Sequence, residues 1–472
     1  MGQEIDDARF DPADFKTFEL RLRTEHQMLS DWFRAGAFSP TTGVGGAELE
    51  IWLVDRDGNP APQNRDFLRH INSPLVAPEL SEFNVELNCA PENLSGRGLS
   101  RLQSGLEDIW GRVRGVARDM KLGVAMIGIL PTVKAGDLTL GHVSRLNRFF
   151  ALNEQILRAR KGKPINLAIE GKDRLSLSHD DVMLEAAATS FQIHYQISQA
   201  EAARVYNASK IASGPLVAVS ANSPFLFGKD LWAETRIPLF EQAVSVNEWD
   251  YSERVTFGVS YLVQSLEECF LSNIQRYPVL LPRLSDDPAA RLNHVRLHNG
   301  TIWRWNRPLI GYEADGRPHL RIENRVVPAG PTMIDNVANA ALYYGVTAAL
   351  AHQKEPPELD ILFSQARDNF YAAARLGLDA DFEWFEGRKR KVRDLILEEI
   401  LPLARQGLAQ LRVDDDDAAR YIGVIEHRVQ RGQNGAAWQR AFVARHGADM
   451  NALCLAYLER QDSGEPVHTW TV

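Results

Sequence analysis

The sequence has few cysteines, no long apolar run and no basic tract interleaved with aromatic residues. Its three cysteines, Cys89, Cys269 and Cys454, are far apart and odd in number, which fits neither a disulfide framework nor a CxxC metal knuckle. We therefore expect a reducing, cytoplasmic location. No run reaches the length that spans a bilayer, and the acidic start MGQEIDDARFDPADF lacks the apolar segment of a secretion signal. Neither a membrane protein nor a secreted one is expected.

Bulk composition is that of an ordinary globular protein. Apolar residues make up 44% and charged residues 24% of the 472 residues, and the formal net charge is -9. A chain of this length can bury a substantial core. The acidic balance and the absence of an aromatic and basic pattern disfavour nucleic acid as a partner.

Hydrophobic periodicity predicts alternating helices and strands in the first part of the chain. Helical spacing occurs in residues 14–36, 98–121, 144–160 and 199–212. Period-two alternation predicts strands in residues 46–55, 83–91, 190–198, 300–308 and 319–327, and the apolar run 122–130 predicts a buried strand. The turn sequence DRDGNP follows the first strand, residues 221–228 predict a loop, and three prolines predict an irregular stretch from 270 to 300.

Beyond Pro331 the pattern is almost entirely helical. Helices are predicted in residues 332–354, 358–376, 390–411, 415–430, 435–446 and 449–460. No low-complexity linker separates them from the strand-rich part. We expect an α+β protein in which residues 1–355 form a catalytic domain with an N-terminal helix, and residues 356–472 form a helical region packed on it.

Four predicted strands carry polar side chains along one face. These side chains are Glu48 and Glu50; Asn84, Glu86 and Asn88; Gln192, His194 and Gln196; and Arg321, Glu323 and Arg325. A sheet with one solvated face has the same alternation, and for any single strand that is the better interpretation. A solvated face favours lysine, threonine and serine, however, and these four faces contain no lysine.

The chemistry of the four faces points to metal and phosphate. Several carboxylates on one surface repel one another unless cations compensate them, which indicates a bound divalent ion. Oxygen ligands with one imidazole suit Mg²⁺ or Mn²⁺ better than zinc. Arginines beside such ions typically neutralise phosphate. The sequence thus predicts nucleoside triphosphate chemistry without a P-loop, because TTGVGG at residues 41–46 lacks the lysine and the following helix of that motif.

In order and character, GAELEIWLVD, PELSEFNVELNCAPE, FQIHYQIS and LRIENRV resemble the active-site strands of the glutamine synthetase and glutamate-cysteine ligase superfamily. The loop ANSPFLFG resembles its bacterial carboxylate-amine ligase branch, the glutamate-cysteine ligase type 2 proteins. The resemblance covers roughly residues 44–345. It implies a curved, mainly antiparallel sheet that forms an open, barrel-like active-site funnel with helices packed outside. It also implies ATP and Mg²⁺ (or Mn²⁺) as cofactors, and a homo-oligomer.

Carried over by position, the resemblance implies a role for each polar residue. Glu50, Glu79 and Glu86 would hold the ion nearer the substrate carboxylate and the γ-phosphate, whereas Glu48, His194 and Glu323 would hold the ions that bridge the ATP phosphates. Arg304, Arg321 and Arg325 would neutralise the transferring phosphoryl group. Arg236 and Asn88 would contact the substrate. Trp303 is either a surface for adenine or ordinary packing around an arginine stem.

The metal ligand set stays open at several positions. Gln192 stands where many relatives have the first histidine of an HxH pattern that ends at His194. Glu82 and Glu92 compete with Glu79 and Glu86 for the carboxylate roles, and the seven-residue separation of Glu79 and Glu86 favours the latter two.

The resemblance implies an ATP-dependent carboxylate-amine ligase that forms an amide, γ-glutamyl-type bond through an acyl phosphate. Its substrates would be an amino-acid carboxylate and an amine, with glutamate and cysteine as the default pair. One alternative is a phosphotransferase of the same fold that stops at a phosphorylated product, as guanidino kinases do. The other is a binding protein for ATP and amino acids without turnover, against which the intact acidic residues argue. The sequence does not identify the acceptor.

Overall fold

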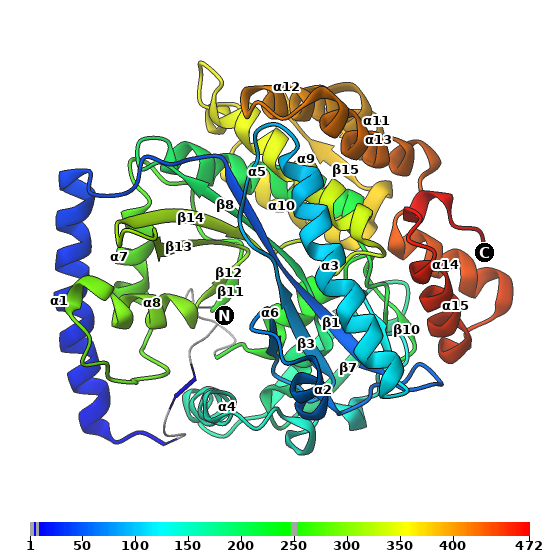
Figure 1. Cartoon of the computed structure of the whole chain (residues 1–472), viewed down its shortest axis with the longest axis horizontal. Coiled ribbons are helices and arrows are strands. Elements are labelled where there is room, and N and C mark those ends of the chain that lie inside the picture. Colours follow the sequence, from blue (N-terminus) through cyan, green and yellow to red (C-terminus); the bar gives the residue numbers. More distant parts are fainter. Residues whose placement is uncertain (1–3, 6–8, 247–252) are drawn as a thin grey trace.

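A curved antiparallel sheet lies at the centre of the computed structural model, which describes residues 4–5, 9–246 and 253–472 (Figure 1). Its strand order is β13-β14-β8-β1-β3-β2, and β4 and β5 also pair with β1. The strands of this sheet are β1 Val44–Val54, β2 Val76–Pro78, β3 Asn84–Asn88, β4 Glu92–Asn93, β5 Gly123–Ala125, β8 Phe191–Ile197, β13 Asn306–Tyr312 and β14 Pro318–Asn324. The α+β class and the curved antiparallel sheet expected from the sequence are confirmed.

Strand β1 organises the sheet because it pairs with β8 along one edge and with β3 along the other. Its alternating sequence places the apolar residues Leu49 and Ile51 in the core, fully buried. Gly45 is required by a close approach, because an added Cβ would lie 2.6 Å from the hydroxyl of Tyr344. That hydroxyl donates hydrogen bonds to the carbonyls of Gly46 and His194, so it ties β1 to β8.

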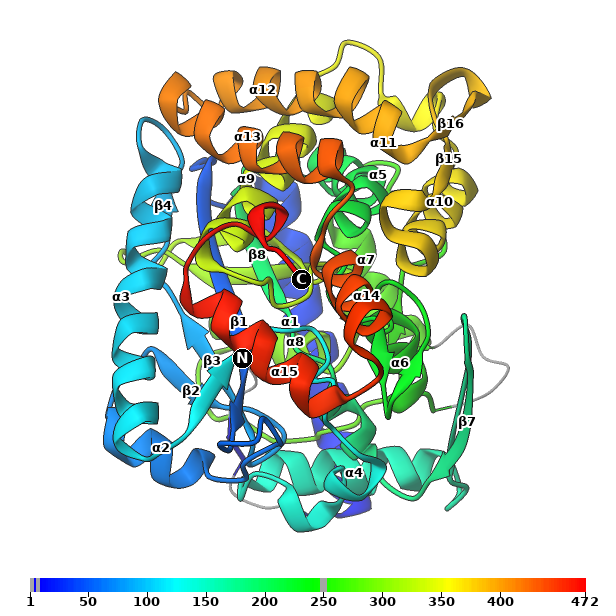
Figure 2. The same cartoon turned by 90° about the vertical axis from the view of Figure 1, so that its right-hand side faces the viewer.

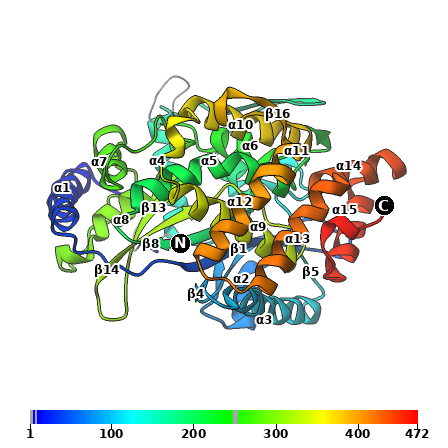
Figure 3. The ribbon, with the colours of Figure 1, turned by 90° about the horizontal axis from the view of Figure 1, so that it is seen from above.

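Helices surround the sheet. They are α1 Pro12–Ala35, α2 Asn64–Ile71, α3 Gly98–Asp119, α4 Asn147–Ala159, α5 Ala202–Ser220, α6 Arg236–Ala243, α7 Glu267–Arg276, α8 Asn293–Gly300, α9 Met333–Ala351, α10 Phe363–Leu376, α11 Val392–Leu395, α12 Leu401–Gln410, α13 Asp415–Arg431, α14 Gly435–His446 and α15 Met450–Asp462. Among the described helices, none is long and apolar enough to cross a membrane. Figure 3 shows α1, α7 and α8 at one end of the molecule and α14 and α15 at the other.

The helices α5 and α9 cover one face of the sheet, with α5 against β13 and β14 and α9 against β8. Almost every residue of both helices is buried, as expected for helices that are apolar nearly all round. The opposite face of the sheet is therefore the one that remains open to a ligand.

The C-terminal helices pack on this central layer. Figure 2 shows α12 and α13 above α5 and α9. Helices α9 and α12 approach so closely that a Cβ added to Gly407 would lie 1.8 Å from the carbonyl oxygen of Gly345. The C-terminal helices share one hydrophobic core with the rest of the chain. The division of the chain at residues 355 and 356 stays a prediction.

Three predicted segments differ from the structure. The apolar run 122–130 forms a strand only at its start, in β5, because the following residues leave the sheet: the Met126 nitrogen donates to Gln461 of α15, and the Ile127 carbonyl accepts from Thr189. The stretch 270–300, predicted to be irregular, contains α7 and α8, and its three prolines lie in the connection between these helices. The strand predicted at 300–308 is broken at Trp305.

No sequence pattern predicted α2, α6 or the small two-stranded sheets, except that Trp303–Arg304 lies within the strand predicted at 300–308. Those sheets are β6 Ile165–Glu170 with β7 Arg174–His179, β9 Phe225–Leu226 with β10 Lys229–Asp230, β11 Val255–Thr256 with β12 Trp303–Arg304, and β15 Asp381–Glu383 with β16 Lys389–Lys391. Of these, the pair β11 and β12 is parallel and the other three are antiparallel.

Candidate active site

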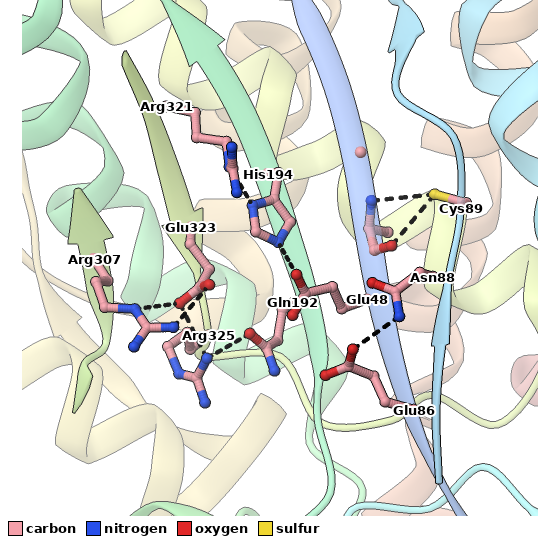
Figure 4. A network of polar contacts seen from close by, with 12 residues as sticks. Glu48, Glu86, Asn88, Cys89, Gln192, His194, Arg307, Arg321, Glu323 and Arg325 are labelled. Atoms are coloured by element: carbon pink, nitrogen blue, oxygen red, sulfur yellow. Dashed lines mark hydrogen bonds and ion pairs between the residues drawn. The ribbon is translucent and has the colours of Figure 1, made fainter. Parts of the chain in front are cut away.

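The open face of the sheet gathers the polar side chains of β1, β3, β8 and β14 (Figure 4). Strand register explains the grouping. Glu50 of β1 lies directly opposite Glu86 of β3, and His194 of β8 lies directly opposite Glu323 of β14. Neighbouring residues across a pleated sheet have side chains within contact distance on the same face.

The first group, Glu48, His194 and Glu323, is called the imidazole cluster below. One ligand atom from each of the three residues lies within 4.8 Å of the others. The Nε2 atom of His194 is 3.2 Å from a carboxylate oxygen of Glu48. Burial by itself would raise the pKa of Glu48, but the neighbouring imidazole outweighs it and lowers this pKa to about 2. Glu48 is thus an anion at neutral pH.

Two arginines hold Glu323. The Nε and Nη2 atoms of Arg307 donate to its two oxygens at 2.8 and 3.0 Å, and Nη1 of Arg325 donates at 3.0 Å. Glu323 is fully buried, which opposes ionisation, yet the two guanidinium groups keep its pKa well below the usual range. The bidentate pair fixes the plane of the Arg307 guanidinium.

Arg307 was missed by the sequence analysis, which chose Arg304 from the same motif. Arg304 is buried, donates to Oδ1 of Asn273 at 2.5 Å, and lies 5.5 Å from the centre of the Tyr277 ring. It does not line the cavity described below. The break at Trp305 is the reason, because it makes Arg307 the register partner of Glu323.

The second group, Glu50, Glu79 and Glu86, is called the carboxylate cluster. Its ligand atoms also lie within 4.8 Å of one another. Glu50 and Glu86 are buried, and Glu79 comes from the connection between β2 and β3. Burial, followed by the charge of Glu79, raises the pKa of Glu50 to about 7. Burial and the charges of Glu48 and Glu79 raise the pKa of Glu86 well above its usual value.

Gln192 joins the two groups, although it belongs to neither. Its Nε2 atom donates to Glu50 at 2.8 Å, and its Oε1 atom accepts a hydrogen bond from Arg325. The second oxygen of Glu50 accepts from the backbone nitrogen of Ser190 at 2.7 Å. Both oxygens of Glu50 are thus oriented by β8 and by the residue that directly precedes it. In this geometry Gln192 positions a carboxylate and an arginine at once.

A carboxyl group that the sequence analysis missed lies beside the carboxylate cluster. Glu185 belongs to a 3-10 helix, Val182–Ala187, and borders the same space as Glu50 and Glu79. Burial and these two neighbouring charges raise its pKa to about 8. No sequence signal marked Glu185, because its segment DDVMLEAAA is apolar without strand alternation.

Both clusters line a cavity of about 250 Å³. Arg307, Arg321, Arg325, Glu185 and Gln192 line the same cavity. Apolar residues also line this cavity, namely Phe149, Leu152, Phe270, Leu281, Leu297, Trp303, Leu309 and Ile310, and Arg148, Asn293, Arg296 and Asn299 are further polar lining residues. A cavity lined by both charged and apolar side chains suits a ligand with a polyanionic end and a flat, less polar end.

The remaining residues assigned from the sequence lie at or near this cavity. Arg321 donates to Nδ1 of His194 at 3.2 Å, and Asn88 donates to Glu86 at 2.9 Å. Arg236 is buried, donates to Glu234 at 3.1 Å and to the carbonyl of Val326 at 2.6 Å, and lines a smaller adjoining cavity of about 30 Å³ with Glu50, Glu79 and Glu185.

The competing carboxylates lie outside the cavity. Glu82 pairs with Arg145 at 3.4 Å, and Glu92 pairs with Arg101 at 2.9 Å. Neither borders the two cavities. The structure therefore brings together Glu79 and Glu86, and not Glu82 or Glu92, with Glu50.

The donor atoms fit hard divalent ions. The two clusters offer five carboxylates and one imidazole, and oxygen-rich sets of this kind suit Mg²⁺ or Mn²⁺. The raised pKa values of Glu50 and Glu86 express the cost of burying uncompensated carboxylates, which a cation would remove.

Comparisons with known proteins bear on the family and the fold. The sequence model of glutamate-cysteine ligase family 2 matches residues 44–456. The solved structure of glutamate-cysteine ligase from Francisella tularensis in complex with AMP is similar with a TM-score of 0.54 and 14% identity, over 92% of this chain and 96% of that one. A bifunctional glutathione synthetase from Pasteurella multocida is similar with a TM-score of 0.53 and 12% identity, over 93% of this chain and 55% of that one. At these identities the two structures show a common fold. A search of curated proteins finds no matching relative.

Proposed function

The chain belongs to glutamate-cysteine ligase family 2 and is a ligase, and from this premise we propose that it activates a substrate carboxylate with ATP and joins it to an amine. The observation that carries the proposal is that two ligand clusters and three arginines line one cavity, which also has apolar lining residues. This arrangement supports phosphoryl transfer, in which positioning and charge neutralisation supply most of the catalysis.

Each cluster would hold Mg²⁺ or Mn²⁺, which when bound neutralises phosphate charge. The chain's own residues then orient the reactants. Arg307 and Arg325, fixed in place by Glu323, present guanidinium groups to phosphoryl oxygens in the cavity. Arg321 adds a third positive charge in the same cavity. The apolar lining residues, Trp303 among them, take the adenosine end.

The reaction has two steps. An oxygen of the substrate carboxylate attacks the γ-phosphorus of ATP, which forms an acyl phosphate and breaks the bond to ADP, the leaving group. The nitrogen of the amine then attacks the acyl carbon, phosphate leaves with the shared oxygen, and the nitrogen loses a proton to give an amide. Both steps develop negative charge on phosphoryl oxygens, which the three arginines counter.

The substrate pair is proposed from the family name alone as glutamate and cysteine. Purified protein would be supplied with ATP, Mn²⁺ and a panel of amino acids and amines, with ADP release and product mass as readouts. Amine-dependent ADP release with an amide product supports the ligase. ADP release with a stable phosphorylated product would instead identify a phosphotransferase, and silence across the panel with ATP still bound would identify a binding protein.

The cluster assignment has its own test. Glu86→Gln removes one carboxylate of the carboxylate cluster with little change in shape, and activity should fall at least 100-fold. Glu82→Gln is the matched control, because Glu82 lies three residues from Glu79 but faces Arg145 instead of the cavity. Equal activities of the two variants would contradict the assignment.

A further inference from the structure

The hairpin of β6 and β7 presents an unpaired strand edge. These two strands form a sheet of their own, and β7 lies near the right-hand edge of Figure 2. In the register of the hairpin, Ile165 pairs with His179 and Ala168 pairs with Ser176. β7 has only β6 as a strand neighbour in the described part of the chain.

The direction of the backbone groups on β7 follows from one hydrogen bond. The backbone nitrogen of Ala168 donates to the side chain of Gln242 at 2.8 Å, so it points away from β7. Its partner Ser176 is then in a non-hydrogen-bonded pair, and the N–H and C=O groups of Ser176 point away from β6. By the period of two, those of Arg174 and Ser178 do the same.

The hairpin is held rigidly at its turn. The backbone nitrogen of Asp173 donates to the carbonyl of Asp230 at 2.7 Å, and Asp173 accepts from the backbone nitrogen of Asp230 at 2.9 Å. Nε1 of Trp232 donates to the carbonyl of Glu170 at 2.8 Å. The edge is thus ordered before any partner arrives, which lowers the entropy cost of pairing.

The edge also lacks the usual protection against pairing. Natural edge strands carry lysine, proline or a bulge that blocks a further strand. The segment RLSLSH has none of these in the described hairpin, and its outward-facing side chains between the ends are two serines. Arg174 at its start and Asp180 directly after its end are both exposed and have opposite charges.

These charges fit a second copy of the same strand. Two antiparallel β7 strands related by a two-fold axis at Leu177 place Ser176 opposite Ser178, and Arg174 opposite Asp180, in both halves of the pair. The pairing of Ser176 with Ser178 uses the backbone groups that point outward, and the pairing of Arg174 with Asp180 joins their exposed side chains. A register shifted to centre on Ser176 would place Arg174 opposite Ser178 and lose both charge pairs. Self-complementarity of this kind is what a two-fold interface requires.

We propose that the β7 edge is an interface between two copies of this chain, which join their hairpins into one four-stranded antiparallel sheet with Arg174 of each copy facing Asp180 of the other. Affinity comes from main-chain hydrogen bonds along the edge, as in other strand additions. Specificity for a second copy comes from the charge pairs.

The test measures the dimer dissociation constant of the full chain by sedimentation velocity. Arg174→Asp and Asp180→Arg each place like charges opposite one another and should weaken the dimer about 10-fold. The double variant, which exchanges the two charges, should restore the wild-type constant. Ser176→Pro removes an outward N–H and should leave the chain monomeric with its ligase activity intact. Arg56→Asp makes an equal charge change at an exposed residue outside the hairpin, and it should leave the dimer dissociation constant unchanged.

Three results would overturn the proposal. The first is a wild-type chain that stays monomeric at 100-fold the concentration of the assay. The second is a dimer that Ser176→Pro leaves intact while circular dichroism shows a folded chain. The third is a double variant no stronger than the single ones, since that would exclude the register centred on Leu177.

Discussion

The carboxylate cluster should make the metal-free protein less stable as the pH rises, and a divalent ion should reverse the trend. Burial and neighbouring charges raise the pKa of Glu50 to about 7 from its ordinary value of 4.5. A carboxyl whose pKa is raised by folding holds its proton longer in the folded state than in the unfolded state. Its stabilising contribution is present in full below pH 4.5 and is lost as the pH rises through 7.

The size of this loss of stability follows from the pKa shift of Glu50. One pKa unit corresponds to about 1.4 kcal/mol, so Glu50 accounts for about 3 kcal/mol of lost stability across this window. Glu86 and Glu185, whose pKa values are also raised, add to it. An ion that binds only the ionised, folded cluster restores about 2.7 kcal/mol at 100 times its dissociation constant. A chain of 472 residues has an unfolding entropy near 1 kcal/mol/K, so each change moves Tm by about 3 °C.

Differential scanning calorimetry at pH 5 and pH 8, with EDTA or with Mn²⁺, measures both effects. We expect the gain in Tm from Mn²⁺ to be larger at pH 8. In EDTA at pH 8, Glu50→Gln should be more stable than the wild type because it removes a buried charge, whereas Glu82→Gln should match the wild type. A gain from Mn²⁺ that is equal at both pH values, or that is as large in Glu50→Gln as in the wild type, would refute the reasoning.

Three further outcomes follow from the contacts. Arg307→Met should lower kcat at least 100-fold, whereas Arg304→Met should mainly lower Tm. Steady-state kinetics on the folded variants measures both kcat values. A larger loss of kcat in Arg304→Met than in Arg307→Met would support Arg304, the residue chosen from the sequence. Gln192→Leu leaves Glu50 and Arg325 without their shared partner, so kcat should fall about 10-fold or more; unchanged kcat would show that neither group needs it. Gly407→Ala inserts a Cβ into backbone contact between α9 and α12, and chemical denaturation should report a loss of about 3 kcal/mol or more; a loss under 1 kcal/mol would mean that the helices separate easily.

Much of the site could be predicted from the alternation of polar and apolar residues along single strands. Five of the six proposed metal ligands lie at the polar positions of a period-two pattern, namely Glu48, Glu50, Glu86, His194 and Glu323. Alternation fixes which residues share a face, because the side-chain period of a strand is two. The sequence therefore determined that carboxylates, an imidazole and arginines would lie on one side of a sheet, and the resemblance of those segments assigned them to two clusters.

Only the tertiary structure decided which arginine meets Glu323, that Gln192 orients Glu50 and Arg325, and that Glu185 borders the cavity. Register between strands and the path of a 3-10 helix depend on contacts between segments distant in the sequence, and no local period encodes them. The same holds for α7 and α8. The prolines do lie in the connection between these two helices. The helices themselves are short and are stabilised by packing against α1, which no local pattern shows. Local periodicity set the chemistry of each face, and the pairing of the strands set its geometry.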